Sequence, residues 1–196
     1  MERHELTELH YITHIANVPS TLNLGILSHN RAKRVDHQTV AMQEIQDRRA
    51  KVTIPGGRKL HDYVNLYICA RNPMMYKRQA QYREICVLRI SPDVIDLPGV
   101  VVCDRNASSE YAIFGAAPDG LKIVNKEWTF AEYWTDSDQI IEWQKKAAKC
   151  AEVLVPDKVE SRYITGVYVA CSEVQQTLKV LARDVPVEIN SHLFFR

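Results

Sequence analysis

The spacing of apolar residues predicts a strand followed directly by a helix near the start of the chain. Residues 9–13, Leu-His-Tyr-Ile-Thr, are rich in β-branched and aromatic side chains and predict the first strand. Asn17 can cap a short helix that runs through Leu24. Pro19 suits the first turn of this helix and Gly25 suits its end. Backbone N–H groups at such a junction can bind a phosphate or amide ligand, although many strand-to-helix turns bind nothing.

A second helix is predicted over residues 39–49, where apolar residues recur at roughly helical spacing. Arg48 and Arg49 fall at its end, before a turn at residues 54–58. A planar guanidinium binds phosphate with two hydrogen bonds, so arginines before a glycine turn can serve a dinucleotide. The alternative, that both arginines only interact with the helix dipole, stays open at this point.

The rest of the chain is dominated by short β-branched and aromatic runs, bounded by Pro, Gly or Asp, with two further helical patterns. Strands that occur in runs, with helices between and outside them, indicate an α+β fold and not a regular βαβ series. No repeat or linker is found, so residues 1–196 are interpreted as a single domain. The remaining predicted elements are strands at 63–69, 85–90 and 100–103, a helix at 136–149, strands at 151–155 and 163–169, a helix at 172–183 and a strand at 185–189.

Residues 149–156 place one carboxylate inside an apolar strand. Alternation puts Cys150, Glu152 and Leu154 on one face of that strand, and its alanine and valine residues on the other. Burying a carboxylate is costly unless it is paired or lies at the mouth of a cleft. Glu152 is therefore either a functional group or one half of a structural ion pair.

The overall composition is that of an ordinary globular protein. Of the 196 residues, 46% are hydrophobic and 25% are charged. No stretch approaches the roughly 20 apolar residues of a membrane span, and the acidic N-terminal segment is not a signal peptide. The five cysteines are an odd number without a C-x-x-C spacing. They indicate reduced thiols in a cytoplasmic protein and argue against a disulfide framework or a cysteine zinc site.

Positive charge is concentrated in one part of the chain. Residues 28–89 hold 13 Lys and Arg against five Asp and Glu, whereas residues 101–196 hold 11 against 14. Such a bias is typical of a surface that faces a polyanion, although chance clustering on a solvated face also produces it. Basic and aromatic side chains are interleaved from Arg71 to Arg83 without an acidic residue, the combination expected for binding single-stranded nucleic acid. Tyrosine and methionine are also ordinary core residues.

Several common kinds of site are excluded. The sequence contains no G-x-G-x-x-G, no P-loop, no G-x-S-x-G and no H-E-x-x-H. His10 and His14 are four residues apart, but a strand does not give this spacing the geometry of a zinc site. We therefore expect no metal. Paired-carboxylate hydrolysis is not excluded, but no local spacing supports it.

Four segments stand out in this order along the chain: ITHIANVPS…GILS, EIQDRRA, LHDYVNLYICARNPMMY and CAEVLVPDKV, which run from about residue 9 to residue 169. Taken together, they resemble the DarT family of DNA ADP-ribosyltransferases. The third segment is the most distinctive. The resemblance implies an α+β ADP-ribosyltransferase fold, with a split, mostly antiparallel sheet, flanking helices, and NAD in the cleft between the two halves of the sheet.

The resemblance also implies roles for single residues. The catalytic glutamate of the family falls on Glu152 and its essential arginine falls on Arg49, with Arg48 as the more variable neighbour. Loss of nicotinamide leaves positive charge on the ribose, which a carboxylate can stabilise. The guanidinium can hold the phosphates of NAD or orient the attacking base. The residues expected to bind NAD as co-substrate are Tyr11, Thr13, Asn17, Arg49 and Tyr67.

Single-stranded DNA is the implied substrate, because a paired and stacked base cannot present its edge to an enzyme. Residues 125–150 correspond to the loop-and-helix region that covers DNA in the family. The implied role is that of a toxin, and the expected partner is an antitoxin, either a hydrolase that removes ADP-ribose from DNA or a direct inhibitor. The residues expected to contact DNA are Arg71, Asn72, Met75, Tyr76, Lys77 and Arg78.

The chain departs from the family pattern at two places. His10 and Tyr11 stand where most members carry Tyr-His, and residues 65–67 are N-L-Y where many carry P-F-Y. The first change places tyrosine and not histidine next to the nicotinamide, and the changes favour guanine over thymine as the modified base. Two alternatives are an enzyme of the same fold that acts on RNA or protein, and a non-catalytic nucleic-acid-binding module. Retention of Arg49 and Glu152 argues against the second alternative.

Overall fold

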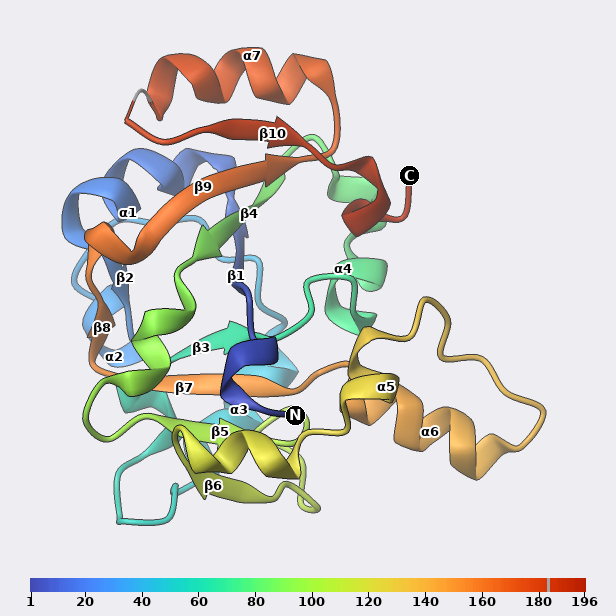
Figure 1. Ribbon diagram of the computed structural model, residues 1–196. Helices are drawn as coiled ribbons and strands as arrows, with labels where there is room; N and C mark the ends of the chain where they lie inside the picture. The colour runs from blue at the N-terminus through green and yellow to red at the C-terminus, as the bar shows by residue number, and fades with distance from the viewer. Residues whose placement is uncertain (183) are drawn as a thin grey trace.

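Most of the strands lie in one eight-stranded sheet, in the order β10-β9-β4-β1-β3-β7-β5-β6 (Figure 1). The computed structural model describes residues 1–182 and 184–196. Neighbouring strands of this sheet are antiparallel, except that β9 and β10 are parallel. The strands are β1 (Leu9–His14), β2 (Ile26–Leu27), β3 (Tyr63–Tyr67), β4 (Ile85–Ile90), β5 (Val101–Cys103), β6 (Phe114–Ala116), β7 (Glu152–Pro156), β8 (Lys158–Val159), β9 (Ile164–Val169) and β10 (Val187–Ile189).

The large sheet is split in its middle. β1 pairs with β4 along six residues but with β3 at a single position, His10 opposite Tyr67. Two halves therefore diverge from this point, β10-β9-β4-β1 and β3-β7-β5-β6, and they are seen above and below one another in Figure 1. Backbone groups and side chains at the open end of the split are left for other contacts.

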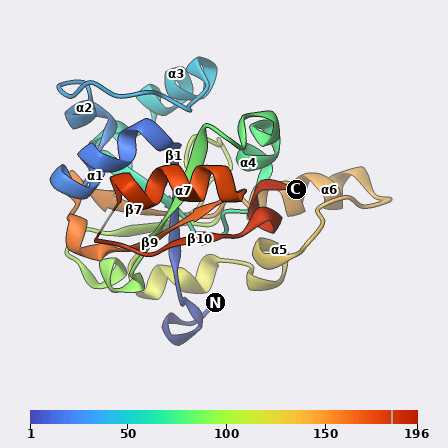
Figure 2. The same cartoon turned by 90° about the horizontal axis from the view of Figure 1, so that it is seen from above.

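Helices cover both sides of the sheet. Figure 2 shows α1, α2 and α3 on one side and the N-terminal turn on the other. β2 and β8 form a separate two-stranded sheet, and Gly25 connects α1 to β2 at φ +83°. A Cβ at Gly25 would lie 2.3 Å from the carbonyl oxygen of Val159, so this close approach requires glycine. The helices are α1 (Val18–Leu24), α2 (His29–Ala32), α3 (Gln43–Lys51), α4 (Pro73–Lys77), α5 (Lys126–Phe130), α6 (Gln139–Ala148) and α7 (Ser172–Leu181).

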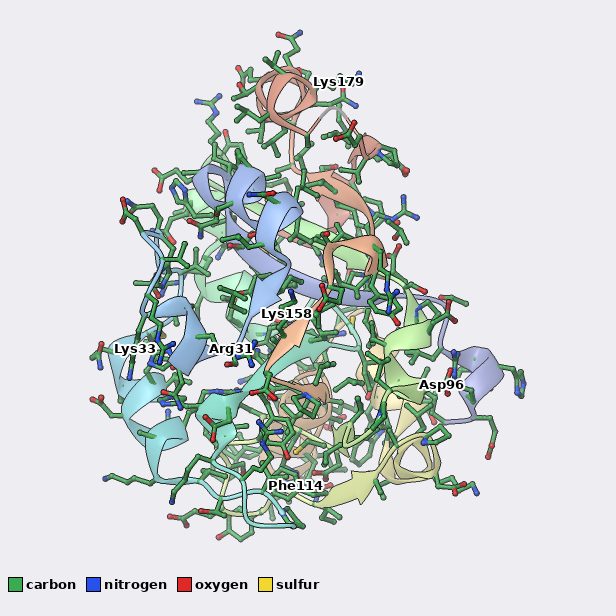
Figure 3. All side chains as sticks on the ribbon, turned by 90° about the vertical axis from the view of Figure 1, so that its left-hand side faces the viewer. Arg31, Lys33, Asp96, Phe114, Lys158 and Lys179 are labelled. Atoms are coloured by element: carbon green, nitrogen blue, oxygen red, sulfur yellow. The ribbon has the colours of Figure 1, made fainter. Side chains whose placement is uncertain are left out.

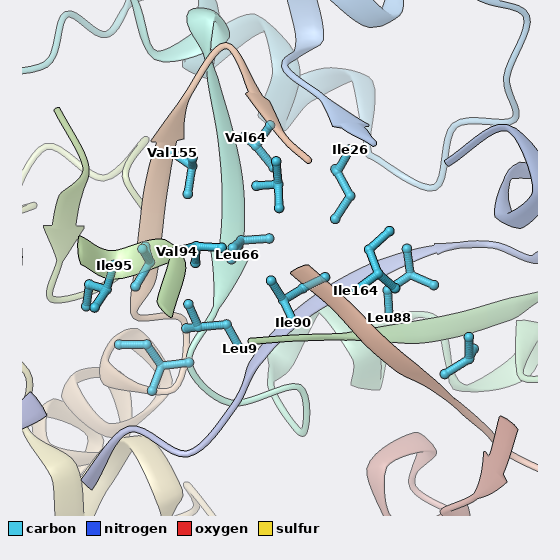
Figure 4. Close-up of a cluster of buried hydrophobic side chains, with 14 of the residues drawn as sticks. Leu9, Ile26, Val64, Leu66, Leu88, Ile90, Val94, Ile95, Val155 and Ile164 are labelled. Carbon is cyan, nitrogen blue, oxygen red and sulfur yellow. The ribbon is translucent and has the colours of Figure 1, made fainter. Parts of the chain in front are cut away.

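The main core joins the two halves of the sheet. Apolar side chains of β1, β3, β4, β7 and β9 point into one space, as Figure 4 shows for Leu9, Leu66, Ile90, Val155 and Ile164. Full burial of one such side chain contributes about 1.5–3 kcal/mol, so the halves are held together mainly by this contact. A smaller cluster, which includes Ile12 and Tyr67, packs behind the end of the split.

The sequence located most elements and missed some. All seven predicted strands and the helices at 17–24, 136–149 and 172–183 are confirmed within a few residues at each end, although the predicted end of the last helix, residue 183, lies outside the described residues. The elements that were not predicted are α2, α4, α5, β2, β6 and β8. The predicted helix at 39–49 is wrong in its first half, because α3 begins only at Gln43. Among the described residues, every helix is too short or too polar to cross a bilayer.

Candidate active site

A cavity of about 270 Å³ opens where the two halves of the sheet diverge. Its walls come from β1, β3, α3, α4 and the irregular segment 33–42 between α2 and α3. It has an apolar lining with convergent polar groups, as is usual for a small-molecule site. Of the residues predicted to bind NAD or DNA, those that line the cavity are Tyr11, Thr13, Asn17, Arg49, Tyr67, Lys77 and Arg78.

Arg49 and Glu152 form a buried ion pair at this cavity. Nη1 of Arg49 donates to both carboxylate oxygens of Glu152, at 3.3 Å to Oε1 and 3.2 Å to Oε2. The backbone N–H of Ala107 donates to Oε2 at 3.4 Å. The Glu152 side chain is 0% exposed and that of Arg49 is 6% exposed. The structure thus brings together two residues that are 103 positions apart in sequence.

The pKa of Glu152 is raised above its ordinary value, because burial disfavours the carboxylate more than Arg49 and the Ala107 N–H favour it. Breaking a buried pair by removing one partner leaves an uncompensated charge, so the two groups depend on each other. Arg49 lines the cavity and Glu152 does not. Access of a ligand to the carboxylate therefore requires the guanidinium to move.

Tyr67 lies at the point where the halves meet. As the last residue of β3 it is paired with His10 on one side and with Glu152 on the other. Its side chain is 7% exposed. The pKa of Tyr67 is raised well above its ordinary value, first by burial and then by the negative charge of Glu152. The phenol therefore stays protonated and can donate a hydrogen bond at the cavity wall.

Asn17 fixes the segment that covers the cavity. It occupies the cap position of α1 but makes no capping bond, contrary to the sequence prediction. Instead its amide pairs with the backbone of Gln38: Nδ2 donates to the carbonyl at 2.7 Å, and Oδ1 accepts from the N–H at 2.9 Å. Nδ2 also donates to Oγ1 of Thr13 at 3.1 Å. These bonds hold the segment 33–42 against the end of β1.

The sequence analysis missed two histidines in the cavity wall. His29 and His61 stack with ring centroids 4.0 Å apart, and the His61 ring bonds Oε1 of Gln46 on α3 at 3.1 Å. Burial lowers the pKa of His29 to about 4, and the pKa of His61 is also lowered, first by burial and then by Arg49. Both rings are thus neutral near pH 7. A single histidine in each of two separate segments gives no spacing signal, so only the fold shows the pair.

The predicted DNA contacts around α4 divide into two groups. Asn72 and Met75 are both 0% exposed. Oδ1 of Asn72 caps the helix by accepting from the N–H of Met75 at 3.0 Å, and Nδ2 donates to the carbonyl of Cys69. These two residues support α4 and present no surface to a ligand, which corrects the sequence prediction for them. Tyr76 is 47% exposed, and Lys77 and Arg78 line the cavity.

The positive charge of residues 28–89 does not form one continuous surface. Arg31, labelled in Figure 3, and Arg58 both pair with Asp157. Arg89 pairs with Glu8 and with Glu188. Much of the basic excess is therefore neutralised by carboxylates from other parts of the chain. Among the described residues, the cations of this region that form no ion pair include Arg71, Lys77 and Arg78, all at α4.

The described part of the chain contains no group of three His, Cys, Asp or Glu side chains that could hold a metal. A paired carboxylate, a guanidinium that lines the cavity and a protonated phenol can stabilise a sugar cation, bind phosphate and accept a proton. The neutral imidazoles add hydrogen-bonding groups for an uncharged part of a ligand.

Comparison with known proteins gives a consistent result. A family model described as "ssDNA thymidine ADP-ribosyltransferase, DarT" matches residues 10–195. A DNA ADP-ribosyl transferase–DNA ADP-ribosyl glycohydrolase fusion protein of Thermosipho africanus is 32% identical over 201 residues, which cover 96% of this chain and 49% of the fusion protein. This chain therefore spans about half the length of that relative. A DNA ADP-ribosyl transferase of Thermus sp. is 32% identical over 190 residues, 90% of this chain and 88% of that protein.

Solved structures share the fold over almost the whole chain. Thermosipho africanus DarTG in complex with ADP-ribose superimposes with a TM-score of 0.86 at 31% identity, covering 96% of this chain and 51% of that one. Thermus sp. 2.9 DarT in complex with ADP-ribosylated ssDNA gives 0.84 at 26% identity, over 97% of both chains. The same Thermus protein in complex with NAD⁺ gives 0.80 at 25% identity, over 97% of this chain and 98% of that one.

Proposed function

This chain belongs to the DarT family, and from that premise we propose that it transfers ADP-ribose from NAD⁺ to a base of single-stranded DNA and releases nicotinamide. The observation that carries the proposal is the buried Arg49–Glu152 pair at the cavity between the two halves of the sheet. A carboxylate buried at 0% exposure is costly. Transfer of ADP-ribose from NAD⁺ would give this ion pair a catalytic role in addition to its effect on stability.

Glu152 is the proposed catalytic residue. As the bond between the ribose and nicotinamide breaks, its electron pair leaves with nicotinamide and positive charge develops on the sugar. A carboxylate in a cavity of low dielectric stabilises that charge strongly. A nitrogen of the base then bonds to the same sugar carbon and loses a proton, which Glu152 can accept more readily because its pKa is raised above that of an ordinary carboxylate.

Arg49 is proposed to exchange partners during binding. It covers Glu152 in this structure and lines the cavity. A pyrophosphate offers the guanidinium an alternative anion with two oxygens in the right geometry for its fork. Rotation of Arg49 towards the phosphates would uncover the carboxylate at the moment when the sugar arrives. Binding of NAD⁺ would thus activate Glu152.

Four further residues are proposed to complete the NAD⁺ site. Tyr11 and Thr13 belong to β1, Asn17 follows it, and Tyr67 ends β3, so both halves of the sheet contribute. Their hydroxyl and amide groups suit the ribose hydroxyls and the carboxamide of nicotinamide. Lys77 and Arg78, on the same cavity, are proposed to contact the phosphates of DNA.

Two bases of DNA, thymine and guanine, are candidate acceptors of ADP-ribose. The matching family model is described for thymidine, whereas the order His10–Tyr11 favours guanine on sequence grounds. Both assignments require an unpaired base, because the cavity can receive only a base that has left the stack. Thymine is the acceptor to test first, and guanine is the alternative.

The biological setting is proposed from the relatives. Fusion of a transferase with a DNA ADP-ribosyl glycohydrolase in the Thermosipho protein supports a toxin whose modification a partner hydrolase removes. We further propose that residues 1–196 act as one domain, since strands from both ends of the chain share one sheet. A cytoplasmic location is proposed from the five cysteines, all of which are free.

Mass spectrometry of short single strands incubated with NAD⁺ and the protein tests the reaction, with thymine in one strand and guanine in another as the only candidate base. We expect one ADP-ribose on one of the strands and none on the matching duplex. Glu152→Gln should slow transfer by about 100-fold or more, since it removes a charge but keeps the shape of the side chain. Glu160→Gln, at an exposed carboxylate, is the matched control. NAD⁺ consumption with no adduct on DNA would contradict the proposal and direct attention to RNA or protein acceptors.

A further inference from the structure

Three aromatic rings from distant parts of the chain meet beside α4. Tyr76 lies on α4, Trp134 lies between α5 and α6, and Phe195 follows the turn at Ser191–Phe194. The ring centroid of Tyr76 lies 5.6 Å from the ring centroid of Trp134 and 5.2 Å from that of Phe195. Those of Trp134 and Phe195 are 5.7 Å apart. We call these three residues the aromatic cluster.

The rings of the aromatic cluster meet edge to face, with interplanar angles of 85°, 77° and 69°. Each such contact uses the face of one ring and only the edge of the other. Some faces of the three rings are therefore not covered by the other rings of the cluster. Tyr76 is 47% exposed, and Trp134 and Phe195 are each half-buried. Ring surface remains that a flat partner can cover.

Arg71 supports the aromatic cluster from its other side. Its guanidinium carbon lies 3.9 Å from the centroid of Phe195, and Nη1 donates to the backbone carbonyl of His192. Nε of Arg71 is buried and has no hydrogen-bond partner among the described residues. The ring of Phe195 is thus held in place, and positive charge lies directly against it.

The surroundings of the aromatic cluster are basic. Lys77 and Arg78 follow Tyr76 directly and line the cavity. Neither they nor Arg71 forms an ion pair with a carboxylate in residues 1–182 or 184–196. Unpaired cations beside accessible aromatic faces fit a polyanion that carries flat rings, which is the chemistry of a single-stranded nucleic acid.

We propose that the aromatic cluster is a stacking site for a base of single-stranded DNA that flanks the modified nucleotide. The inference rests on the proposed function, which brings the reacting base to the cavity that Lys77 and Arg78 line. The backbone between the two bases then passes these cations. The site adds Trp134 and Phe195 to the DNA surface, and neither lies in the basic and aromatic run of the sequence.

Fluorescence of Trp134 tests the stacking directly and needs no NAD⁺. The chain has three tryptophans, so the variant Trp128→Phe/Trp143→Phe leaves Trp134 as the single reporter. A single strand of about 10 nucleotides should quench its emission, whereas a duplex of the same sequence, whose bases are already stacked, should not. Unchanged emission while a labelled single strand is bound, as measured by anisotropy, would overturn the proposal.

Binding of the single strand by variants gives a second measure. Trp134→Ala and Phe195→Ala should each raise the Kd about fivefold to a hundredfold, as expected for loss of one base-stacking contact. Trp134→Phe keeps a ring and should restore most of the affinity. Tyr111→Ala removes an aromatic residue that is 77% exposed and lies outside the cluster. Its Kd should stay within about twofold of the unaltered protein, and the same small change for Trp134→Ala would contradict the stacking site.

The transfer assay separates this inference from the proposed function. ADP-ribose transfer to DNA by a protein whose Trp134 is not quenched would overturn the stacking site alone. Quenching without transfer to any DNA would support the stacking site and contradict the proposed reaction. Tighter binding of an RNA strand of the same sequence would contradict DNA as the occupant. If circular dichroism shows that Trp134→Ala is unfolded, the affinity of Trp134→Phe for the single strand and the quenching of Trp134 itself still test the stacking site.

Discussion

At the scale of single residues, burial decides what each polar group can do. Glu152 and Asn72 are both 0% exposed, yet they have different roles because their partners differ. The carboxylate of Glu152 faces a cation that can leave, whereas the amide of Asn72 is bound to backbone groups that cannot. The first arrangement keeps a carboxylate that the proposed transfer reaction can use, and the second fixes a helix.

Transfer activity should depend on the ionisation of Glu152. Its pKa is raised above the ordinary 4.5, so the carboxylate becomes protonated, and inactive, at a higher pH than an exposed glutamate. As pH falls, kcat/KM should therefore decline with an apparent pKa above 4.5. The raised pKa also makes the free energy of unfolding depend on pH. The contribution of Glu152 to stability is complete below pH 4.5 and is lost as pH rises through its pKa in the folded state, so the buried carboxylate lowers stability at neutral pH. Transfer rates measured across pH check the expected decline in kcat/KM, and circular dichroism at each pH confirms that the protein is folded. A rate that stays flat down to pH 4.5 would contradict it.

Asn72→Ala should destabilise the protein without removing a DNA contact. It loses the cap of α4 and leaves the Cys69 carbonyl without its donor, which together cost about 1–3 kcal/mol. Thermal unfolding should show a Tm lower by several degrees. Asn23→Ala, at an exposed position of α1, is the control and should change stability by less than about 0.5 kcal/mol. A normal Tm together with weaker DNA binding would restore Asn72 as a direct contact.

At the scale of elements, the largest difference between sequence and structure is the segment 33–42. Its apolar spacing predicts a helix from residue 39, but the backbone of Gln38 is bonded to the side chain of Asn17 and Met42 is extended. Thr39 and Val40 are β-branched and weak helix formers. Two tertiary hydrogen bonds therefore outweigh a marginal local preference. Because of them this segment is part of the cavity wall and α3 begins later.

Asn17→Ala should raise the KM for NAD⁺ about fivefold to thirtyfold, because it removes the hydrogen bonds that hold segment 33–42 over the cavity. Limited proteolysis within residues 33–42 should become faster at the same time, which loss of a direct contact to NAD⁺ alone would not cause. Asn23→Ala serves again as the control. An unchanged KM with faster proteolysis would show that the segment does not contribute to NAD⁺ binding.

At the scale of the whole molecule, the site exists because the sheet is split. Its halves are joined by one residue pair and by the apolar core, and the cavity takes residues from both of them. A ligand in this cavity contacts both halves and so opposes their separation. Tyr67, on one half, and Tyr11, on the other, both line the cavity and can then contact the same molecule.

NAD⁺ should therefore raise the Tm of the protein. A ligand at about 100 times its Kd stabilises the folded state by about 2.7 kcal/mol, which corresponds to a Tm shift of roughly 5–10 °C for a domain of this size. Arg49→Ala should abolish most of the shift, whereas Arg162→Ala, at an exposed arginine on another element, should not. A shift that is equal in both variants would exclude Arg49 as a phosphate ligand.

The sequence by itself determined the α+β class, the longer strands and the family, because alternation and motif order can be read directly from the chain. It also singled out Glu152 and Arg49. It could not determine that these two residues form a pair, that His29 stacks on His61, or that Asn72 and Met75 are buried. Nor could it join Trp134 and Phe195 to Tyr76. Those relations involve residues far apart in sequence, and only the pairing of strands and the packing of the core bring such residues into contact.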